Sequence, residues 1–416
     1  MSTSIAVVNI GQLVTLAGPE RPRVGRELAQ LSLLRDAAMI IQNGRIEAVG
    51  TYCDLLPVIP KFAHIIDAAG RCVTPGFVDA HTHFVFAGNR AAEFEQRIAG
   101  QSYQQIAASG GGIQRTVRLT RAATEDDLFE QARRHLSWMM RSGTTTVEGK
   151  SGYGLNRETE LRLLGVMARL ADQGFATVIP TLLAHTVPPE FADQRAAYVN
   201  WFAKEFVPEV ARARLAAFCD VFCDEHAFTM EEARTILESA GRNGMELRVH
   251  SEQFRSGTGA ALAAEMRART ADHLEMATRE TLEALRQAGV QPVLLPGSVF
   301  SLGSSSYPAA RLMVELGLPI VLATDFNPGS SPIVSIPFIL SLACLHMGLS
   351  PGEALSAATI NAAWSLGVGR RFGSLEAGKQ ADFLIHEFAD YREIAYFIAS
   401  PAQPRVFTAG IEVNFD

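Results

Sequence analysis

Two histidines separated by one residue, His81 and His83, directly follow an apolar segment of the sequence. Side chains on a β-strand alternate between its two faces, so these imidazoles are expected to point the same way. Such a pair is either half of a metal site or two ordinary core or surface histidines. A metal site that stays open to water needs a few more nitrogen and oxygen ligands. His250 and Asp325, each at the end of its own apolar segment, are the candidates for these ligands.

A metal site of this composition predicts hydrolytic chemistry, because a divalent metal lowers the pKa of a bound water to near neutrality. Asp325 can contact both the metal and the water, so it is the candidate acceptor of the water's proton. His273, at the end of another apolar segment, is expected to polarise the carbonyl under attack or to orient the water. The alternative for His273 is a histidine that only orients a metal ligand.

Several polar segments suit a small, charged substrate. Arg90 follows the histidine pair and suits a bidentate grip on a carboxylate, although a surface ion pair is the alternative. Tyr153 lies between two glycines, where it can lean into a pocket or simply pack. The segment Phe326–Pro332 offers an amide, hydroxyls and backbone N–H groups, but it also has the composition of a turn. The glycine-rich Ser109–Gly112 lacks the Lys-Ser/Thr of a phosphate-binding loop, and we expect a mobile lid there.

The elements that must position these residues are apolar, strand-like segments separated mostly by amphipathic helical stretches. The expected strands are the eight segments Thr74–His83, Thr144–Glu148, Thr177–His185, Cys219–Glu225, Leu247–Glu252, Thr270–Leu274, Pro292–Pro296 and Pro319–Asp325. The clearest helices are expected at Glu158–Asp172, Met230–Asn243, Gly259–Arg269 and Thr278–Ala288. This alternation predicts an α/β protein with a TIM-type (β/α)8 barrel. Functional side chains of such a barrel lie at the carboxyl ends of its strands, where this sequence has His81, His83, His185, Glu225, His250, His273 and Asp325.

The two chain ends contain only short strand-like segments. Ala38–Val49 includes Asn43-Gly44, the pattern of a hairpin turn between two strands. Further strands are expected at Ser4–Ala17, Ala63–Ala68, Asp382–His386 and Val406–Asn414. We therefore expect residues 69–370 to form the barrel, and residues 1–68 and 371–416 to form a small composite β-sandwich from both chain ends.

The bulk composition excludes several classes of function. The 416 residues are 48% hydrophobic and 19% charged, with a formal net charge of −7. No basic cluster and no apolar run of bilayer length is found, so we expect neither a nucleic-acid partner nor a membrane. The first residues do not have the pattern of a signal peptide. Five cysteines, an odd number, argue against a disulfide scaffold and favour a reducing, cytoplasmic location.

The segment Pro75–His83 (PGFVDAHTH) resembles the first-strand signature of the amidohydrolase superfamily. Further segments narrow the resemblance to the imidazolonepropionase family, and they are Gly88–Glu95, Ala107–Val117, Lys150–Leu155, Ala271–Glu275, Leu295–Gly297 and Ala323–Pro332. The most specific of them are KSGYGL at Lys150–Leu155 and ATDFNPGSSP at Ala323–Pro332. The resemblance covers essentially the whole chain.

The resemblance implies a TIM barrel with a composite β-sandwich, one zinc or iron ion, and a homodimer. The metal ligands that it implies are His81, His83, His250 and Asp325. The substrate-binding positions that it implies are Arg90, Tyr153, His185, Gln253, Asn327, Gly329 and Ser330. The implied activity is hydrolysis of 4-imidazolone-5-propanoate to N-formimidoyl-L-glutamate during histidine breakdown, with a metal-activated water attacking the ring carbonyl. Some members carry Glu at position 253; Gln253 cannot act as a base, so proton transfer falls to Asp325 and His273.

Two further questions about the site follow from the resemblance. Two-metal relatives use a carboxylated lysine on the fourth strand, but Cys219–Glu225 contains no lysine and Lys150 lies on another strand, so one metal is expected. The alternative functions are a deaminase of another nitrogen heterocycle, which would release ammonia directly, and a non-enzymatic barrel whose site has decayed. The pocket segments argue against the first, and the intact set of four ligands with His273 argues against the second.

Overall fold

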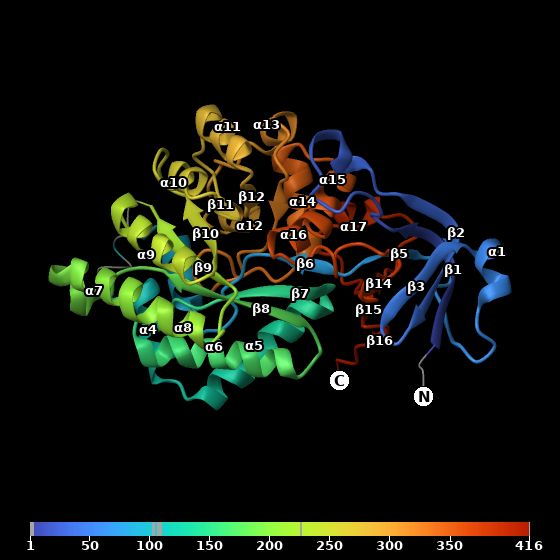
Figure 1. The fold of residues 1–416 in the computed structure, drawn as a ribbon, viewed down its shortest axis with the longest axis horizontal. Helices are drawn as coiled ribbons and strands as arrows, with labels where there is room; N and C mark the ends of the chain where they lie inside the picture. Colours follow the sequence, from blue (N-terminus) through green and yellow to red (C-terminus); the bar gives the residue numbers. More distant parts are fainter. Residues whose placement is uncertain (1–3, 102–104, 106–109, 225–226, 416) are drawn as a thin grey trace.

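A computed structural model describes residues 4–101, 105, 110–224 and 227–415 of the chain. One of its two eight-stranded sheets is parallel, with the strand order β13-β12-β11-β10-β9-β8-β7-β6 (Figure 1). These strands are β6 (Phe77–Asp79), β7 (Thr144–Lys150), β8 (Thr177–Ala184), β9 (Phe218–Cys223), β10 (Glu246–Ser251), β11 (Thr270–His273), β12 (Gln291–Leu294) and β13 (Val321–Leu322). The strand order follows the chain order, which confirms the predicted (β/α)8 barrel.

The barrel closes just beyond its first and last strands. The Asp325 N–H donates to the His81 carbonyl oxygen at 3.0 Å, and Thr82 forms a parallel bridge with Phe326. This contact helps to bring together the predicted metal ligands that follow β6 and β13, which lie more than two hundred residues apart in the chain.

Helices follow most of the barrel strands. They are α2 (Ala91–Ile98), α4 (Ile113–Ala122), α5 (Glu125–Arg141), α6 (Arg157–Asp172), α7 (Arg195–Trp201), α8 (Val207–Arg212), α9 (Met230–Arg242), α10 (Gly259–Glu265), α11 (Arg279–Ala288), α12 (Pro296–Ser301), α13 (Ala310–Glu315), α14 (Ile336–Met347), α15 (Pro351–Ala357), α16 (Ile360–Ser365) and α17 (Arg392–Tyr396). Local sequence fixes several of their starts. Thr124 and Thr229, for example, cap α5 and α9 with side-chain oxygens that accept from the backbone N–H three residues on. The four helices expected from the sequence are confirmed, although α10 is shorter than expected.

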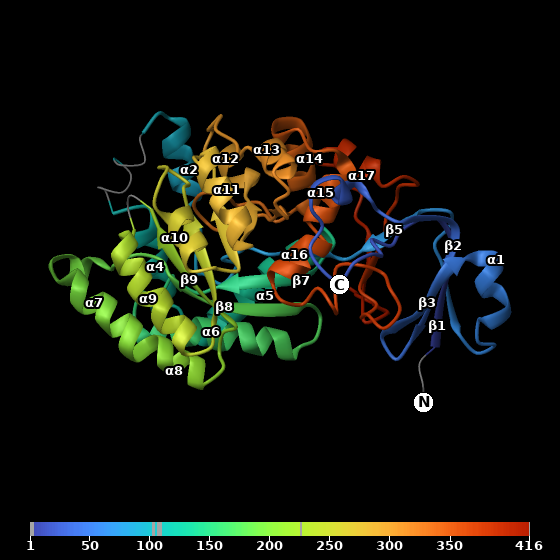
Figure 2. The same cartoon turned by 45° about the horizontal axis from the view of Figure 1, so that its top comes forward.

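A second, mixed sheet contains strands from both chain ends. Its path is β16-β15-β14-β5-β1-β2-β3, with β4 beside β1. The strands are β1 (Ser4–Val14), β2 (Leu33–Gln42), β3 (Arg45–Thr51), β4 (His64–Asp67), β5 (Cys72–Pro75), β14 (Phe383–Ile385), β15 (Arg405–Thr408) and β16 (Ile411–Glu412), and the short helix α1 (Tyr52–Leu55) follows β3. Figures 1 and 2 both show β1, β2 and β3 at one end of the molecule, far from α7 and α9. The predicted domain limits, after residues 68 and 370, stay predictions.

Two expected strands need correction, and two residues of other predictions lie outside the described part of the chain. The segment Thr74–His83 is not one strand, because it leaves the mixed sheet after β5 and enters the barrel at β6, turning at Gly76. A Cβ at Gly76 would lie 2.2 Å from Thr145 Oγ1, so this passage requires glycine. Val406–Asn414 is two strands, since the chain turns at Ala409-Gly410, both with positive φ. Glu225 and Ser109, at the expected end of the fourth strand and in the expected lid, lie outside the described residues.

The predicted hairpin turn at Asn43-Gly44 is confirmed. Both residues have positive φ, 50° and 76°, as the two central residues of a type I′ turn require. A core of apolar side chains, mostly Val, Ile, Leu and Phe, packs against the mixed sheet. A much larger apolar core lies between the barrel and its helices. None of the described helices is both long enough and apolar enough to cross a membrane.

Candidate active site

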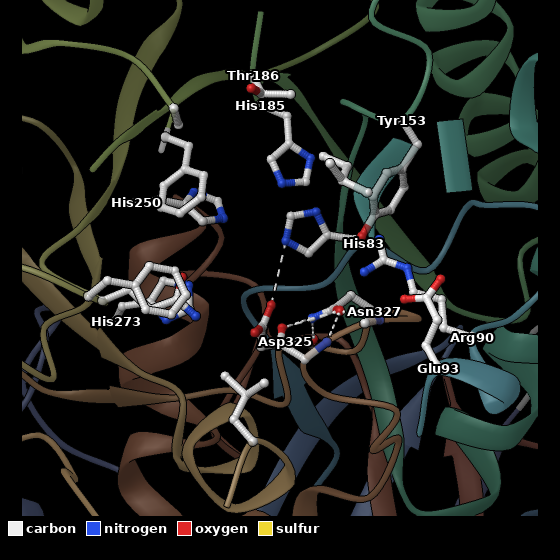
Figure 3. A pocket seen from close by; sticks show the side chains of 18 of the residues that line it. His83, Arg90, Glu93, Tyr153, His185, Thr186, His250, His273, Asp325 and Asn327 are labelled. Atoms are coloured by element: carbon white, nitrogen blue, oxygen red, sulfur yellow. Dashed lines mark hydrogen bonds and ion pairs between the residues drawn. The ribbon is translucent and has the colours of Figure 1, made fainter. Parts of the chain in front are cut away.

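A cavity of about 530 Å³ opens at the carboxyl ends of the barrel strands. It is lined by His83, Arg90, Glu93, Arg97, Ile113, Tyr153, His185, Thr186, Phe222, Ala227, His250, Gln253, Phe254, Leu302, His273, Asp325, Asn327, Gly329 and Ser330. Figure 3 shows His83 between His185, His250 and Asp325, while Arg90 and Glu93 lie together on another side of the cavity. The residues that the sequence analysis assigned to metal binding, catalysis or substrate contact all line this cavity except His81, which is fully buried.

The predicted metal ligands converge on Asp325. Its Oδ1 lies 3.6 Å from His81 Nε2 and 3.5 Å from His83 Nε2. The ring centroid of His250 lies 4.5 Å from that of His81 and 5.5 Å from that of His83. Ligand atoms of His81, His83 and Asp325 lie within 4.8 Å of one another, and so do those of His81, His250 and His273. The nitrogen atoms of His273, at the end of β11, are therefore close enough to those of His81 and His250 to bind the same metal ion.

The buried polar atoms of this cluster fit a metal ion. His81 Nε2 and His250 Nε2 are buried and have no hydrogen-bond partner among the described residues, and His83 faces Asp325 with its Nε2. Burial lowers the pKa of His81, His83 and His250, so their imidazoles are neutral and have a lone pair to offer. Buried nitrogen atoms without partners are costly unless something binds them, and three imidazoles with one carboxylate suit zinc or iron.

Asp325 is a buried carboxyl with unusual protonation and backbone geometry. Burial raises its pKa to about 7, against the opposing influence of the charge on His273. Its φ of 55° and the φ of 83° at His273 lie in the left-handed region, which non-glycine residues adopt at a cost of about 1–3 kcal/mol each. Strained backbone at two strand ends of one cavity is typical of a functional site.

Asp79, in the first-strand signature, holds Asp325 in register. Its carboxylate accepts hydrogen bonds from the Thr324 N–H at 3.0 Å and from Thr324 Oγ1 at 2.6 Å. Asp79 is fully buried, and burial raises its pKa to about 7. The two hydrogen bonds tie β6 to β13 one residue before Asp325, and so set the distance between the histidine pair and that carboxylate.

His273 is paired with an acidic neighbour. Its Nδ1 lies 3.3 Å from Glu275 Oε1. Burial alone would lower the pKa of His273, but the negative charge of Glu275 and its hydrogen bond outweigh burial and raise the pKa to about 9. The imidazole is therefore protonated at neutral pH when no cation is nearby, and it can donate a proton or a hydrogen bond toward the cavity.

Arg90 presents a free guanidinium edge to the cavity. Its Nε donates to Thr116 Oγ1 at 2.9 Å, which fixes the side chain from behind. Its Nη1 lies so close to Gly329 that a Cβ there would be only 2.3 Å away. Among the described residues no carboxylate pairs with Arg90, so the surface ion pair considered above is not observed there.

The loop after Asp325 is organised by Asn327. Its Oδ1 accepts from the N–H groups of Gly329 and Ser330, both at 2.8 Å. Its Nδ2 donates to the Asp325 carbonyl oxygen at 2.7 Å and to Ser330 Oγ at 2.9 Å. The amide thus shapes the loop that presents Gly329 and Ser330 to the cavity.

Tyr153 and His185 form an aromatic wall with His83. Their ring centroids lie 5.9 Å and 5.7 Å from that of His83, and 5.4 Å from each other. His185 Nδ1 is 3.2 Å from the Gly152 carbonyl oxygen, and burial lowers the pKa of His185 to about 3. Because a carbonyl oxygen can only accept, Nδ1 of neutral His185 carries the proton, and its Nε2 can accept a hydrogen bond from a ligand.

The sequence analysis missed a residue that fixes Tyr153. Glu160, on α6, is buried, and its carboxylate accepts from the N–H groups of Gly152 and Gly154 at 2.7 Å and of Leu155 at 2.8 Å. It also missed several side chains of the cavity wall, namely Glu93, Arg97, Ile113, Thr186, Phe222, Ala227, Phe254 and Leu302. The sequence could have indicated Glu93, because it lies in the GNRAAEFE segment that carries the family resemblance. No motif in the sequence marks the apolar residues as part of the cavity wall.

Gln253 follows β10 and is placed by a carboxylate beneath it. Asp224 Oδ2 accepts from the backbone N–H of Gln253 at 2.9 Å and of Phe254 at 3.0 Å. The preceding residue, Glu252, has a positive φ of 56°, so the chain turns sharply here and presents Gln253 to the cavity.

Comparison with known proteins agrees with this architecture. The profile of the amidohydrolase family matches residues 72–410. An imidazolonepropionase of Solibacter usitatus is 51% identical, over 97% of this chain and 97% of that protein. One of Symbiobacterium thermophilum is 44% identical, over 98% of this chain and 96% of that protein.

Solved structures with the same fold are more distant in sequence. A 5-methylcytosine deaminase from Klebsiella pneumoniae has a TM-score of 0.72 at 17% identity, covering 99% of this chain and 98% of that one. An adenosine deaminase from Xanthomonas campestris, with bound zinc, has a TM-score of 0.72 at 19% identity, covering 99% and 92%. At such identities the likeness shows the fold alone.

The barrel, the ligand cluster and the match over most of the sequence define the class of protein: the chain belongs to the amidohydrolase family. Members of this family are metal-dependent hydrolases. Within it, the near-full-length relatives place the chain in the imidazolonepropionase group.

Proposed function

We propose that this protein hydrolyses 4-imidazolone-5-propanoate to N-formimidoyl-L-glutamate. The observation that carries the proposal is the pairing, within one cavity, of a cluster of histidines around Asp325 with the unpaired guanidinium edge of Arg90. A substrate with a ring carbonyl at one end and a carboxylate at the other matches these two features. The curated relatives that match almost the whole chain are imidazolonepropionases.

We infer one divalent metal ion, zinc or iron, held by His81, His83, His250 and Asp325. When bound, it would supply a Lewis acid and lower the pKa of a water in the cavity. Lys150 supports a single ion, because its Nζ lies 2.6 Å from Asp220 and 2.8 Å from Glu148 and does not reach the cavity. His273, although near His81 and His250, is engaged by Glu275 and is assigned to catalysis.

Proton transfer falls to Asp325 and His273. Asp325 lines the cavity, and its Oδ1 lies within 3.6 Å of Nε2 of both His81 and His83, so it can accept the proton of the attacking water. It can then pass that proton to the ring nitrogen as the C–N bond breaks. His273, protonated beside Glu275, can donate a hydrogen bond to the carbonyl oxygen on which negative charge develops.

The remaining residues hold the substrate. Arg90 grips the propionate carboxylate, and its planar guanidinium suits two parallel hydrogen bonds. Gly329 and Ser330 line the same part of the cavity, and Tyr153, His185 and Gln253 contact the ring. Neutral ring nitrogens and carbonyls need uncharged donors and acceptors, which the last three residues supply.

The experiment is to follow the absorbance of freshly prepared 4-imidazolone-5-propanoate after adding the purified protein, with and without a chelator. The expected result is loss of absorbance that the chelator stops and zinc or iron restores, with N-formimidoyl-L-glutamate as product. No turnover from metal-loaded protein would overturn the proposal, and release of ammonia from another nitrogen heterocycle would favour a deaminase.

We also propose that the protein is a cytoplasmic homodimer. All five cysteines are free, as suits a reducing compartment. Light scattering on the eluting protein measures the oligomeric state directly, and a monomer mass of about 45 kDa would contradict the dimer.

A further inference from the structure

Five charged side chains form a layer inside the barrel, below the cavity. They are Glu148, Lys150, Asp220, Arg248 and Asp272, and all of them are fully buried. None lines the cavity. They are therefore close to the site but cannot touch a substrate.

The layer is one connected network. Lys150 Nζ lies 2.8 Å from Glu148 Oε1 and 2.6 Å from Asp220 Oδ2. Arg248 lies 3.3 Å from the same Glu148 oxygen and 3.1 Å from Asp272 Oδ2. Two cations thus link three carboxylates in an uninterrupted chain across the sheet, from β7 to β11.

The network ends on two of the inferred metal ligands. Asp272 Oδ2 lies 2.6 Å from Nδ1 of His81, and Asp220 Oδ2 lies 3.0 Å from Nδ1 of His250. When Nδ1 of an imidazole carries the proton toward a carboxylate, Nε2 is left with its lone pair. For His81 that free Nε2 is the atom facing Asp325.

We propose that Asp272 and Asp220 are positioning residues that hold His81 and His250 in the tautomer and orientation needed for metal binding, and that Lys150 and Arg248 keep those carboxylates in place. The inference rests on the metal site of the proposed function. It goes beyond the ligands themselves, because it assigns the strength of metal binding to side chains that never touch the metal.

The composition of the layer supports a role in the site. Replacing buried ion pairs by well-packed apolar residues is often neutral or stabilising, so five buried charges are not explained by stability alone. The three carboxylates exceed the two cations by one, and two of these carboxylates lie against histidines of the inferred metal site.

The test uses Asp272→Asn and Asp220→Asn, which keep the size of the side chain but remove its charge. The measured quantity is the Zn²⁺ affinity of the metal-free protein in competition with a chromophoric chelator, without any substrate. We expect each variant to bind Zn²⁺ about 10–100-fold more weakly. We also expect a changed visible spectrum for the Co²⁺-loaded variants, because the orientation of a ligand changes.

Asp382→Asn is the matched control, because Asp382 is also a buried carboxylate but accepts from Gln380 and the Ala409 N–H, away from the cavity. It should bind Zn²⁺ as the wild type does. Thermal unfolding of the metal-free variants separates the two roles. Unchanged Zn²⁺ affinity in the two site variants, with only a lower melting temperature, would overturn the proposal.

Asp272→Glu provides a second measurement if Asp272→Asn does not fold. It keeps the charge but moves the oxygen by one methylene, so a weaker Zn²⁺ affinity is again expected, and an unchanged one again contradicts the proposal. Because these readouts need no substrate, failure of the proposed reaction would leave them interpretable.

Discussion

The guanidinium of Arg90 lies directly against Gly329, where a Cβ would stand 2.3 Å from Nη1. The loop after Asp325 and the start of α2 therefore meet only because residue 329 has no side chain. Asn327 holds Gly329 in that place, because its Oδ1 accepts a hydrogen bond from the backbone N–H of Gly329.

Gly329→Ala should consequently displace Arg90 and weaken substrate binding. We expect KM to rise by about tenfold with little change in kcat, since only an interaction that is equal in the ground and transition states is lost. Gly165→Ala is the control: it lies on α6, nothing lies within 4 Å of its added Cβ, and it should be neutral or slightly stabilising. Equal KM values for Gly329→Ala and Gly165→Ala would show that the contact between Arg90 and Gly329 does not affect substrate binding.

Arg90→Met removes the charge that we assign to the propionate carboxylate. Charged hydrogen bonds contribute roughly 1.5–3 kcal/mol, so KM should rise by about 10–100-fold, and Arg90→Lys should be intermediate. Arg134→Met, an exposed arginine on α5, should leave KM unchanged. Steady-state kinetics measure all three; an unaltered KM in Arg90→Met would show that the carboxylate binds elsewhere.

Asp325→Asn should abolish most turnover while some metal stays bound by the three histidines. Losing a proton acceptor of this kind typically lowers the rate by about 10²–10⁴-fold. Metal content and kcat must be measured on the same preparation, because loss of metal alone would mimic loss of the base. Near-normal kcat in a metal-loaded variant would remove Asp325 from proton transfer.

Glu160→Gln should loosen the loop that carries Tyr153. The amide can keep one set of acceptor contacts, but its NH₂ group then faces a backbone N–H, so the variant loses about 1–3 kcal/mol of stability. We expect a lower melting temperature together with a raised KM. Tyr153→Phe, which keeps the loop but removes the hydroxyl, separates the two effects, and a stability loss with unchanged KM would mean that the loop tolerates the change.

His386 predicts a pH dependence of stability. It is buried beside Thr74, with Nε2 2.9 Å from Oγ1, and burial lowers its pKa to about 3. Unfolded chains protonate histidine below about pH 6.5, so the unfolded state binds more protons as the pH falls. His386 therefore leaves the free energy of unfolding undiminished above about pH 6.5. Between about pH 6.5 and pH 3 it lowers this free energy by as much as about 1.4 kcal/mol for each pH unit.

Chemical unfolding of His386→Gln between about pH 7 and pH 4 checks this sign. The variant should show a shallower loss of stability than the wild type over that range. His64→Gln, an exposed histidine on β4, should follow the wild type. Parallel curves for wild type and His386→Gln would show that His386 does not contribute.

Much of the architecture was predictable from the sequence, because patterns within single segments of the chain determine it. Apolar strand segments alternate with capped helices such as α9, and this alternation depends on residues only a few positions apart. The dipeptide Asn43-Gly44 likewise favours its turn through its own backbone preferences. Strand limits were less predictable. Thr74–His83 divides at Gly76 because the chain changes sheets there, and that change depends on packing against Thr145.

The sequence by itself determined the residue types at the ends of the barrel strands, and through them the histidines, Asp325 and Arg90 as candidates for the site. The tertiary structure alone decided which buried charges support them. Asp272 meets His81 across 191 positions of the chain, and Lys150 meets Asp220 across 70 positions. These contacts exist because barrel closure and helix packing bring distant backbone into register, and no local pattern records which buried carboxylate will lie beside which imidazole.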